Sequence, residues 1–374
     1  MRTYTPPAAL LPALALALLL TALPAPARAA PSLDEMAGQM LMVGFMGMTV
    51  EEADAIARDV AAGRVGGVVL FDVDMTTPAR GPKNIESPEQ VRALTSGLQA
   101  LAPTPLFIAV DQEGGRVMRL KPDYGFPDAP SQREMAEQGP PNTRREAEKI
   151  GRTLADVGVN LDLAPVVDVN LNPKSPAIGA LGRAFSTCPY TTSKNAVAYV
   201  QGLHAAGAVP CREHFPGHGS ARADSHKGLT DVTDTWMELE LIPYEKLLAR
   251  GLVDMVMSAH VYNAHLDPEH PASLSRAVIT GLLREQLGYD GVVATDDLQM
   301  RAITDHYSFE QTVRLAVTAG ADILLFGNNL AYDPDIPAKA VATIRGMVDD
   351  GSVDAARIRR SYERIMALKA RLGE

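Results

Sequence analysis

The chain is organised around residues 208–219, where a short apolar run passes into a histidine-rich segment: Ala208-Val209-Pro210-Cys211-Arg212-Glu213-His214-Phe215-Pro216-Gly217-His218-Gly219. Asp224-Ser225-His226 follows shortly, so three of the eight histidines lie between residues 214 and 226. Proline and glycine exclude a helix here, so we expect a loop. Histidine titrates near neutral pH, and a polar loop of this shape usually holds side chains for a function.

The run that precedes this loop is the fifth of eight apolar runs of strand length, with helical patterns between them. Continuous apolar runs are typical of parallel strands that are buried on both faces. Eight such strands alternating with helices predict one α/β domain, a (β/α)8 TIM-type barrel, with the active site at the C-terminal ends of the strands. The expected strands are Gln39–Phe45, Val65–Phe71, Pro105–Val110, Gly158–Val167, Ala208–Pro210, Asp254–Ala259, Gly291–Ala294 and Ala321–Phe326.

Helix ends are also marked in the sequence. Capping boxes predict helix starts, and glycines shortly before strands predict helix ends. Residues 353–372 have the pattern of a charged amphipathic helix that packs outside the barrel, with Ile358, Ile365 and Leu368 on one side. The expected boxes are Ser87 with Gln90, Thr143 with Glu146 and Ser308 with Gln311, and the expected end glycines are Gly158, Gly207, Gly288 and Gly320.

The N-terminus has the pattern of a secretory signal peptide. Arg2 is followed by an apolar run over residues 8–23 and then by Ala27-Arg28-Ala29, a small-x-small cleavage site. We therefore expect residues 1–29 to be removed, which leaves residues 30–374 as the catalytic barrel domain with its C-terminal helix. The mature protein would be periplasmic or secreted, without a membrane contact. A membrane anchor is the alternative reading of the same run.

The net charge limits the classes of binding partner, and the cysteine content limits disulfide formation. The formal net charge is −10, so nucleic acid and anionic membranes are poor partners. Cys188 and Cys211 are the two cysteines. Two cysteines cannot build a disulfide framework, and their spacing does not decide whether they pair. We expect two free, buried thiols.

Ionisable or amide side chains stand at or just after most of the predicted strands. In a barrel these positions converge on one face, where barrel active sites are built. Each residue alone could be a turn cap or a buried structural group, but the whole set indicates a site. Its members are Asp111, Asp168, His214, His260, Asp296, Asp297, Asn328 and Asn329.

The pattern fits the chemistry of glycosidic bond cleavage. That reaction needs one group that protonates the leaving oxygen and a carboxylate that stabilises or attacks the cationic sugar carbon. Asp296, at a strand end, can be the attacking carboxylate. His226 can supply the proton, with Asp224 two residues earlier orienting its imidazole.

Several segments resemble glycoside hydrolase family 3, in its β-N-acetylglucosaminidase (β-hexosaminidase) branch. The loop from His214 to His226 resembles the signature loop of that family, and the likeness spans most of the chain beyond residue 30. The other matching segments are Asp111-Gln112-Glu113-Gly114-Gly115-Arg116-Val117-Met118-Arg119, Pro271-Ala272-Ser273-Leu274-Ser275, Gly281-Leu282-Leu283-Arg284 and Gly291-Val292-Val293-Ala294-Thr295-Asp296-Asp297-Leu298-Gln299-Met300.

The resemblance implies an exported glycosidase that removes terminal β-N-acetylglucosamine from peptidoglycan-derived or related glycans. It implies a retaining double displacement without cofactor or metal, and it leaves the oligomeric state unknown. Asp296 matches the nucleophile, and His226 matches the acid/base, partnered by Asp224. The positions that match groups holding the sugar are Asp111, Arg119, Arg183 and His214.

One position departs from the family pattern. The family usually has lysine before the first histidine of the loop, and this chain has Glu213. An ionised glutamate only accepts hydrogen bonds, whereas a lysine ammonium only donates them. Arg212 is next to it, but neighbouring residues of a strand face opposite ways, so compensation is not expected from Arg212. We include Glu213 among the sugar-contacting residues and expect it to change sugar recognition.

Three alternatives remain at this point. Asp111, His214, His218, Asp224 and His226 could bind a metal in a barrel hydrolase, although Pro216 and Gly217 exclude the helix of a zinc-protease motif. The chain could also be a non-catalytic sugar-binding relative, for which Glu213 is the support. Phosphorolysis or transglycosylation could replace hydrolysis, because a histidine acid/base tolerates an anionic acceptor.

Overall fold

The eight expected runs form the parallel strands of one sheet in the computed structural model, which describes residues 1–4 and 30–372. An isolated parallel bridge between Ala294 and Ile323 joins the two ends of the strand order, so the sheet closes into a barrel. The predicted (β/α)8 barrel is therefore confirmed. In the order of hydrogen bonding the strands are β11 (Val292–Thr295), β9 (Met255–Ser258), β7 (Val209–Phe215), β6 (Leu161–Asp162), β3 (Phe107–Val110), β2 (Gly67–Leu70), β1 (Leu41–Gly44) and β12 (Leu324–Phe326).

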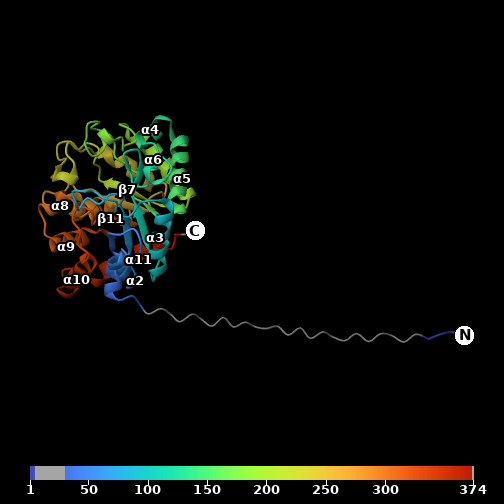
Figure 1. The fold of residues 1–374 in the computed structure, drawn as a ribbon. Coiled ribbons are helices and arrows are strands. Elements are labelled where there is room, and N and C mark those ends of the chain that lie inside the picture. Colours follow the sequence, from blue (N-terminus) through green and yellow to red (C-terminus); the bar gives the residue numbers. More distant parts are fainter. Residues whose placement is uncertain (5–29, 373–374) are drawn as a thin grey trace. The chain divides into compact units, whose positions relative to one another are not determined.

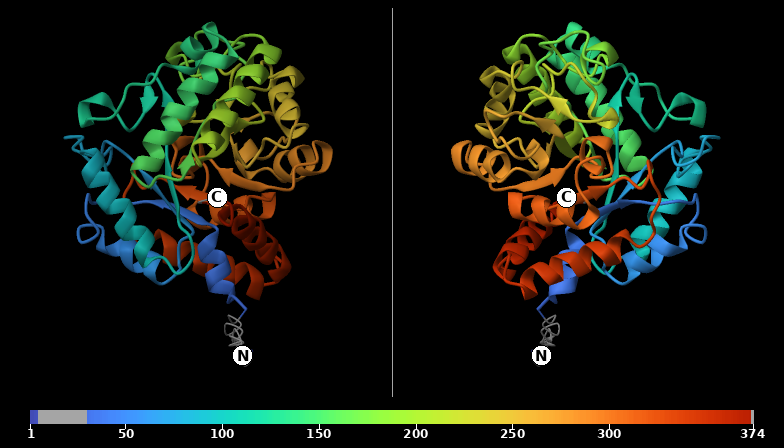
Figure 2. Two further views of the ribbon diagram at one scale, coloured as in Figure 1. Left: turned by 90° about the vertical axis from the view of Figure 1, so that its right-hand side faces the viewer. Right: turned by 90° about the vertical axis from the view of Figure 1, so that its left-hand side faces the viewer.

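Helices surround the outside of this sheet, as Figures 1 and 2 show. Their apolar faces pack on the strands, which makes one continuous core. A π-helix, η6 (Ala277–Gln286), lies between β9 and β11. The α-helices are α1 (Leu33–Gln39), α2 (Asp54–Ala61), α3 (Pro88–Leu101), α4 (Gln132–Glu137), α5 (Pro140–Asp156), α6 (Pro189–Ala205), α7 (Ile242–Leu248), α8 (Arg301–Thr304), α9 (Phe309–Ala319), α10 (Ile336–Asp349) and α11 (Ala355–Lys369).

Most of the predicted helix ends are present. Ser87 caps α3, Ser308 and Gln311 form the capping box of α9, and Gly320 ends α9 with a φ of 117°. Gly158, Gly207 and Gly288 also have positive φ, just after a helix. The prediction for Thr143 is wrong, because α5 already begins at Pro140 and the Thr143 hydroxyl donates to Asn195 Oδ1 at 2.7 Å inside the protein.

The C-terminal helix α11 packs on the barrel through the apolar side that the sequence predicted. Ile358, Ile365 and Leu368 of α11 are buried.

The two cysteines differ in their exposure. Both thiols are free, but only Cys211 is buried. Cys188 is exposed, contrary to expectation, because it lies at the N-terminal cap of the surface helix α6.

Strand β7 is longer than the apolar run that predicted it, and this places part of the site. It continues to Phe215, so Glu213 and His214 lie on the strand and the loop begins at Pro216. Its register with β9 shifts between Arg212 and Phe215, and His214 has a φ of 67°. A non-glycine residue in this left-handed region is strained and marks a position of functional interest.

The predicted signal peptide, residues 1–29, falls outside the described residues except for its first four. Within the described parts of the chain, no helix is long and apolar enough to cross a membrane.

Candidate active site

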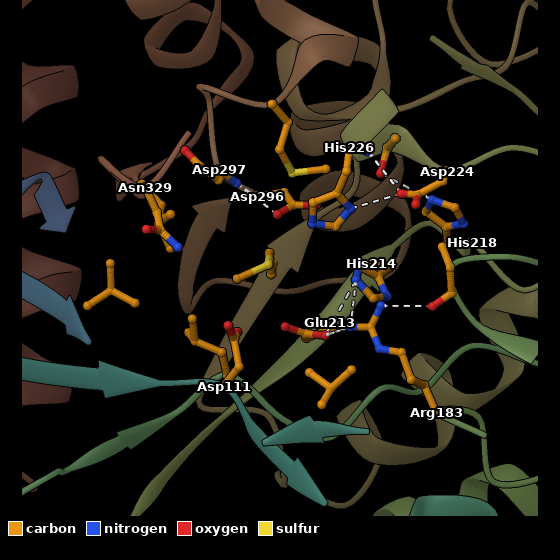
Figure 3. Close-up of a pocket in the computed structure, with 18 of the residues that line it drawn as sticks. Asp111, Arg183, Glu213, His214, His218, Asp224, His226, Asp296, Asp297 and Asn329 are labelled. Carbon is orange, nitrogen blue, oxygen red and sulfur yellow. Dashed lines mark hydrogen bonds and ion pairs between the residues drawn. The ribbon is translucent and has the colours of Figure 1, made fainter. Parts of the chain in front are cut away.

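A pocket of about 340 Å³ opens where the C-terminal ends of the strands meet. It brings together the eight residues that were predicted to act in catalysis or to contact the sugar, although they lie as much as 185 positions apart in the chain, whereas Asp168, His260 and Asn328 of the strand-end set do not line it. Figure 3 shows several of them directed into the same space. They are Asp111, Arg119, Arg183, Glu213, His214, Asp224, His226 and Asp296.

Asp296 follows β11 and is held by backbone groups. Its N–H donates to Ser258 O at 3.0 Å, and its Oδ1 accepts from the N–H of Asp297 at 2.8 Å. Burial raises the pKa of this carboxyl, but His260, His214 and His226 outweigh burial and hold the pKa below its usual value. Asp296 is therefore an ionised carboxylate at the wall of the pocket, which is the state a nucleophile needs.

His226 lies on a short 3-10 helix, η3 (Ser225–Lys227), that contacts α8, and Asp224 is the N-cap residue of this helix. His226 Nδ1 lies 2.9 Å from Asp224 Oδ1. This hydrogen bond is the largest cause of the raised pKa of His226, and it lowers the pKa of Asp224 to about 2. In Figure 3 the His226 ring lies between Asp224 and Asp296. A paired imidazole with a raised pKa, whose side chain remains 59% exposed, can meet an incoming leaving group.

Asp111 and Arg119 form an ion pair that a small hairpin creates. Strands β4 (Gln112–Gly114) and β5 (Val117–Met118) turn the chain back, so that Arg119 Nη2 reaches Asp111 Oδ2 at 2.6 Å. The Arg119 guanidinium also lies over the Phe71 ring, 5.6 Å from its centre. The sequence predicted both charged residues but not the hairpin that joins them.

Arg183 has more protein partners than a sugar-binding residue would be expected to have. It bonds Glu113 through Nε and Nη2, the latter at 2.6 Å from Glu113 Oε1. Its Nη1 donates to Ala177 O at 3.1 Å, and its Nη2 also donates to Glu213 Oε2 at 2.9 Å. Sequence reasoning quoted Glu113 within a motif but missed its role, because its partner is 70 residues away.

Glu213 points into the pocket, and Arg212 points away from it. Arg212 is fully buried and bonds Asp254 Oδ2 at 2.7 Å, so it does not compensate Glu213, as expected. The compensating charge comes instead from Arg183. Burial and Glu113 raise the pKa of Glu213 well above its usual range, Arg183 opposes them, and Asp111 and Asp296 add to the rise.

Asp168 organises the two histidines of the signature loop. His214 Nδ1 lies 2.7 Å from Asp168 Oδ2, and the His218 N–H donates to Asp168 Oδ1 at 2.6 Å. Burial lowers the pKa of His218 to about 4, so this histidine is neutral. His260 bonds Ser273 Oγ at 2.6 Å and the backbone oxygen of Asp297 at 2.8 Å, which makes it a structural support of the Asp296 turn.

One segment that the sequence did not single out holds the backbone of the loop. Trp236 Nε1 donates to Pro216 O at 3.1 Å, and the Tyr244 hydroxyl donates to Glu213 O at 2.7 Å. Between them, Glu240 Oε2 accepts from the N–H of Gly219 at 3.1 Å. Residues 236–244 thus fix one point of β7 and two points of the loop that follows it.

The opposite rim of the pocket joins two loops that follow β2 and β12. Lys83 is buried, and its Nζ donates to Asn329 Oδ1 at 3.1 Å. The same oxygen accepts from the N–H of Met75 at 3.2 Å. Asp297 also lines the pocket, and burial raises its pKa to about 6. Lys83 and Met75 lie in a loop without a motif, so the sequence did not indicate them.

The metal alternative had named five residues of this site. Within residues 1–4 and 30–372, no group of three or more His, Cys, Asp or Glu side chains is arranged to hold a metal ion. Four of the five have ion-pair partners, since Asp111 is paired with Arg119, His214 with Asp168, and Asp224 with His226.

Comparisons with known proteins place the whole chain. Residues 32–368 match the family model described as the glycosyl hydrolase family 3 N terminal domain. A β-hexosaminidase from Pseudomonas aeruginosa is 36% identical over 78% of this chain and 82% of its own length. β-Hexosaminidase A from Pseudoalteromonas piscicida is 32% identical over 82% of this chain, which spans only 54% of that relative.

A solved structure agrees with these sequence matches. A glycoside hydrolase family 3 β-N-acetylglucosaminidase from Paenibacillus sp. str. FPU-7 has a TM-score of 0.83 at 35% identity, over 91% of this chain and 63% of that protein. Fold, motif order and identity point the same way, and the chain therefore belongs to glycosyl hydrolase family 3, with its barrel as the N-terminal domain of that family.

Proposed function

We propose that this protein is a retaining β-N-acetylglucosaminidase that removes terminal β-linked N-acetylglucosamine from peptidoglycan-derived or related glycans. One observation carries the proposal. The pocket combines an ionised carboxylate, Asp296, with a histidine whose pKa is raised by its own carboxylate partner, Asp224. The lowered pKa of Asp296 favours the carboxylate and the raised pKa of His226 favours the imidazolium, which are the forms that the first step of a double displacement requires.

In that step Asp296 attacks the anomeric carbon while His226 gives its proton to the departing glycosidic oxygen. The bond from the anomeric carbon to that oxygen breaks, and a covalent glycosyl–Asp296 ester forms. His226, now neutral, then takes a proton from a water molecule whose oxygen attacks the same carbon. The ester breaks, Asp296 becomes a carboxylate again, and His226 is protonated for the next cycle.

The sugar would be held by the charged residues around Glu213. Asp111, Arg119 and His214 line the pocket on that side, and their polar atoms can bond ring hydroxyls. The relatives named as β-hexosaminidases and β-N-acetylglucosaminidase support a hexosamine as the substrate. Because the chain spans only part of two of these relatives, its activity has to be measured on the chain itself.

The test is the identity of the covalent intermediate. A 2-fluoro glycoside that reacts quickly and hydrolyses slowly should label Asp296, as read by mass spectrometry of the digested protein. Asp296→Ala should reduce turnover of an aryl β-N-acetylglucosaminide to background and leave the melting temperature nearly unchanged. Asp305→Ala, which removes an exposed carboxylate at the C-cap of α8, is the matched control and should keep full activity. Labelling at Asp297 or Asp111 would contradict the assignment.

We also propose that the protein is exported, to the periplasm or the medium. The support is the N-terminal pattern of Arg2, the apolar run of residues 8–23 and Ala27-Arg28-Ala29. N-terminal sequencing of the protein recovered outside the cytoplasm should begin near Ala30. Soluble cytoplasmic protein that keeps Met1 would contradict the proposal.

A further inference from the structure

The side of the pocket around Glu213 has more carboxylates than cations. Arg119 is taken up by Asp111, and Arg183 is shared between Glu113 and Glu213. The three nitrogens of the Arg183 guanidinium all donate to protein acceptors, which leaves it little capacity to bind a ligand. The positive charges of Arg119 and Arg183 are therefore already paired with carboxylates of the protein.

Glu213 keeps an oxygen for a ligand. Its Oε2 is the atom that bonds Arg183, and it lies 3.4 Å from His214 Nε2. Its carboxyl group lies in Figure 3 between Arg183 and Asp111, and the side chain lines the pocket although it is only 4% exposed. An ionised carboxylate only accepts hydrogen bonds, so this wall favours a ligand group that only donates.

An ammonium group on the sugar has that chemistry. It has three N–H donors and a positive charge, whereas an acetamide has one N–H, one acceptor and no charge. Hydrogen bonds between charged partners are roughly twice as strong as neutral ones.

We propose that Glu213 is a specificity-determining residue that makes β-linked amino sugars with a free ammonium group substrates of this pocket, alongside their N-acetylated forms. The inference rests on the proposed function, because it uses the same catalytic residues, and it names a second substrate class for them. Glu213 accepts a hydrogen bond from the ammonium, and Arg183 holds the carboxylate in place.

The competing possibility is that Glu213 carries a proton. Burial and Glu113 favour the protonated form, and Arg183 opposes it. A neutral Glu213 would donate to a sugar oxygen and would give an ammonium no advantage. Replacement of Glu213 by glutamine separates the two cases, because glutamine has the same shape and a neutral donor but never a negative charge.

The experiment compares kcat/KM for aryl β-glucosaminide, with a free amine, and aryl β-N-acetylglucosaminide. At about pH 6 the amine is protonated, since typical amines have pKa values above 7. Wild-type protein should cleave both substrates. Glu213→Gln should lower the ratio of kcat/KM for the amine to that for the acetamide by about 10- to 100-fold, which is the usual effect of one hydrogen bond to a charged group.

A control variant and the possible outcomes separate a failure of this inference from a failure of the proposed function. Glu137→Gln removes an exposed carboxylate outside the pocket and should leave the ratio unchanged. If Glu213→Gln does not fold, competition by glucosamine and by N-acetylglucosamine in wild-type protein gives the same comparison, with glucosamine expected to inhibit. An unchanged ratio, or wild-type protein that cleaves only the acetamide, overturns the inference and leaves the proposed function standing. Wild-type protein that cleaves neither overturns the proposed function itself.

Discussion

Asp224 and His226 illustrate how two residues can share one proton-transfer role. The hydrogen bond between them lowers the pKa of the aspartate to about 2 and raises that of the histidine, so the imidazole keeps its proton to higher pH than an unpaired histidine does. A raised pKa favours the protonated imidazole, which is the form that can donate a proton. It also becomes neutral after giving up that proton, which suits it to activate water in the second step.

Removal of His226 should affect substrates according to their leaving groups. A general acid typically contributes about 10²–10⁴-fold, and only when the leaving oxygen needs its proton. His226→Ala should therefore lower kcat/KM by about that factor for an alkyl or sugar leaving group, and much less for a nitrophenyl glycoside. His306→Ala, at an exposed histidine of the chain, is the control and should change neither substrate.

The pH dependence of kcat/KM provides a second test of the Asp224–His226 pair. The raised pKa of His226 keeps the acid protonated to higher pH, so this histidine should set the alkaline limb of kcat/KM. Asp224→Asn removes the main cause of that raised pKa, and the alkaline limb should move to lower pH. Equal losses on both substrate types, or an alkaline limb that does not move, would show that His226 is structural.

For single residues, the sequence indicated which charged side chains belong to the site, but it did not indicate which residues they interact with. Seven of the eight candidate residues stand in the quoted motifs or at strand ends, which can be recognised in the sequence, whereas Arg183 was indicated by the family resemblance alone. The partner of Arg183 is Glu113, and that of Glu240 is the Gly219 backbone 21 residues before it. Such pairs form only when strands and loops distant in sequence meet, so no local pattern could predict them.

Among the elements, the strands were predictable and their ends were not. Barrel strands are buried on both faces, and this leaves continuous apolar runs in the sequence. β7 carries Arg212, Glu213 and His214 in its second half. Because these residues are polar, the apolar run in the sequence ended before the strand does. Each of these side chains has a buried partner, Asp254, Arg183 and Asp168 respectively, so the strand tolerates them.

The same reasoning explains why the supporting segment was missed. Trp236, Glu240 and Tyr244 bond backbone atoms of residues 213–219. Every residue has these backbone atoms, so the sequence of that segment does not show which of them are bonded. Burial and the nearby Asp168 raise the pKa of Glu240 to about 8, so this carboxyl is largely protonated at neutral pH. The element that carries catalytic side chains is therefore held in shape by another that lacks them.

Across the whole molecule, the two ends of the barrel have different roles. The C-terminal ends of the strands form the pocket. The N-terminal ends are covered by α11, whose Lys369 reaches in to donate to Gln39 Oε1 and Gly66 O, each at 2.7 Å. Its Nζ also lies 5.0 Å from the centre of the Phe107 ring. The lysine thus links the C-terminal helix to the starts of three strands.

Lys369 should make the stability of the barrel depend on pH. Burial lowers its pKa from 10.5 to about 7. Between these values the unfolded chain binds a proton that the folded protein does not, so stability rises with pH through this window. Relative to Lys369→Met, wild-type protein should gain free energy of unfolding from pH 7 to pH 10, by at most about 5 kcal/mol.

Urea unfolding of wild-type protein, Lys369→Met and the exposed control Lys174→Met at several pH values would measure this gain. The methionine also leaves Gln39 Oε1 and Gly66 O without their donor, and this adds a cost that does not depend on pH. The informative quantity is therefore the change in the difference between the two proteins, not its size at one pH. Lys174→Met should follow wild-type protein throughout. If Lys369→Met also runs parallel to wild-type protein, the buried amine keeps its proton in the folded state, and the link through α11 is independent of pH.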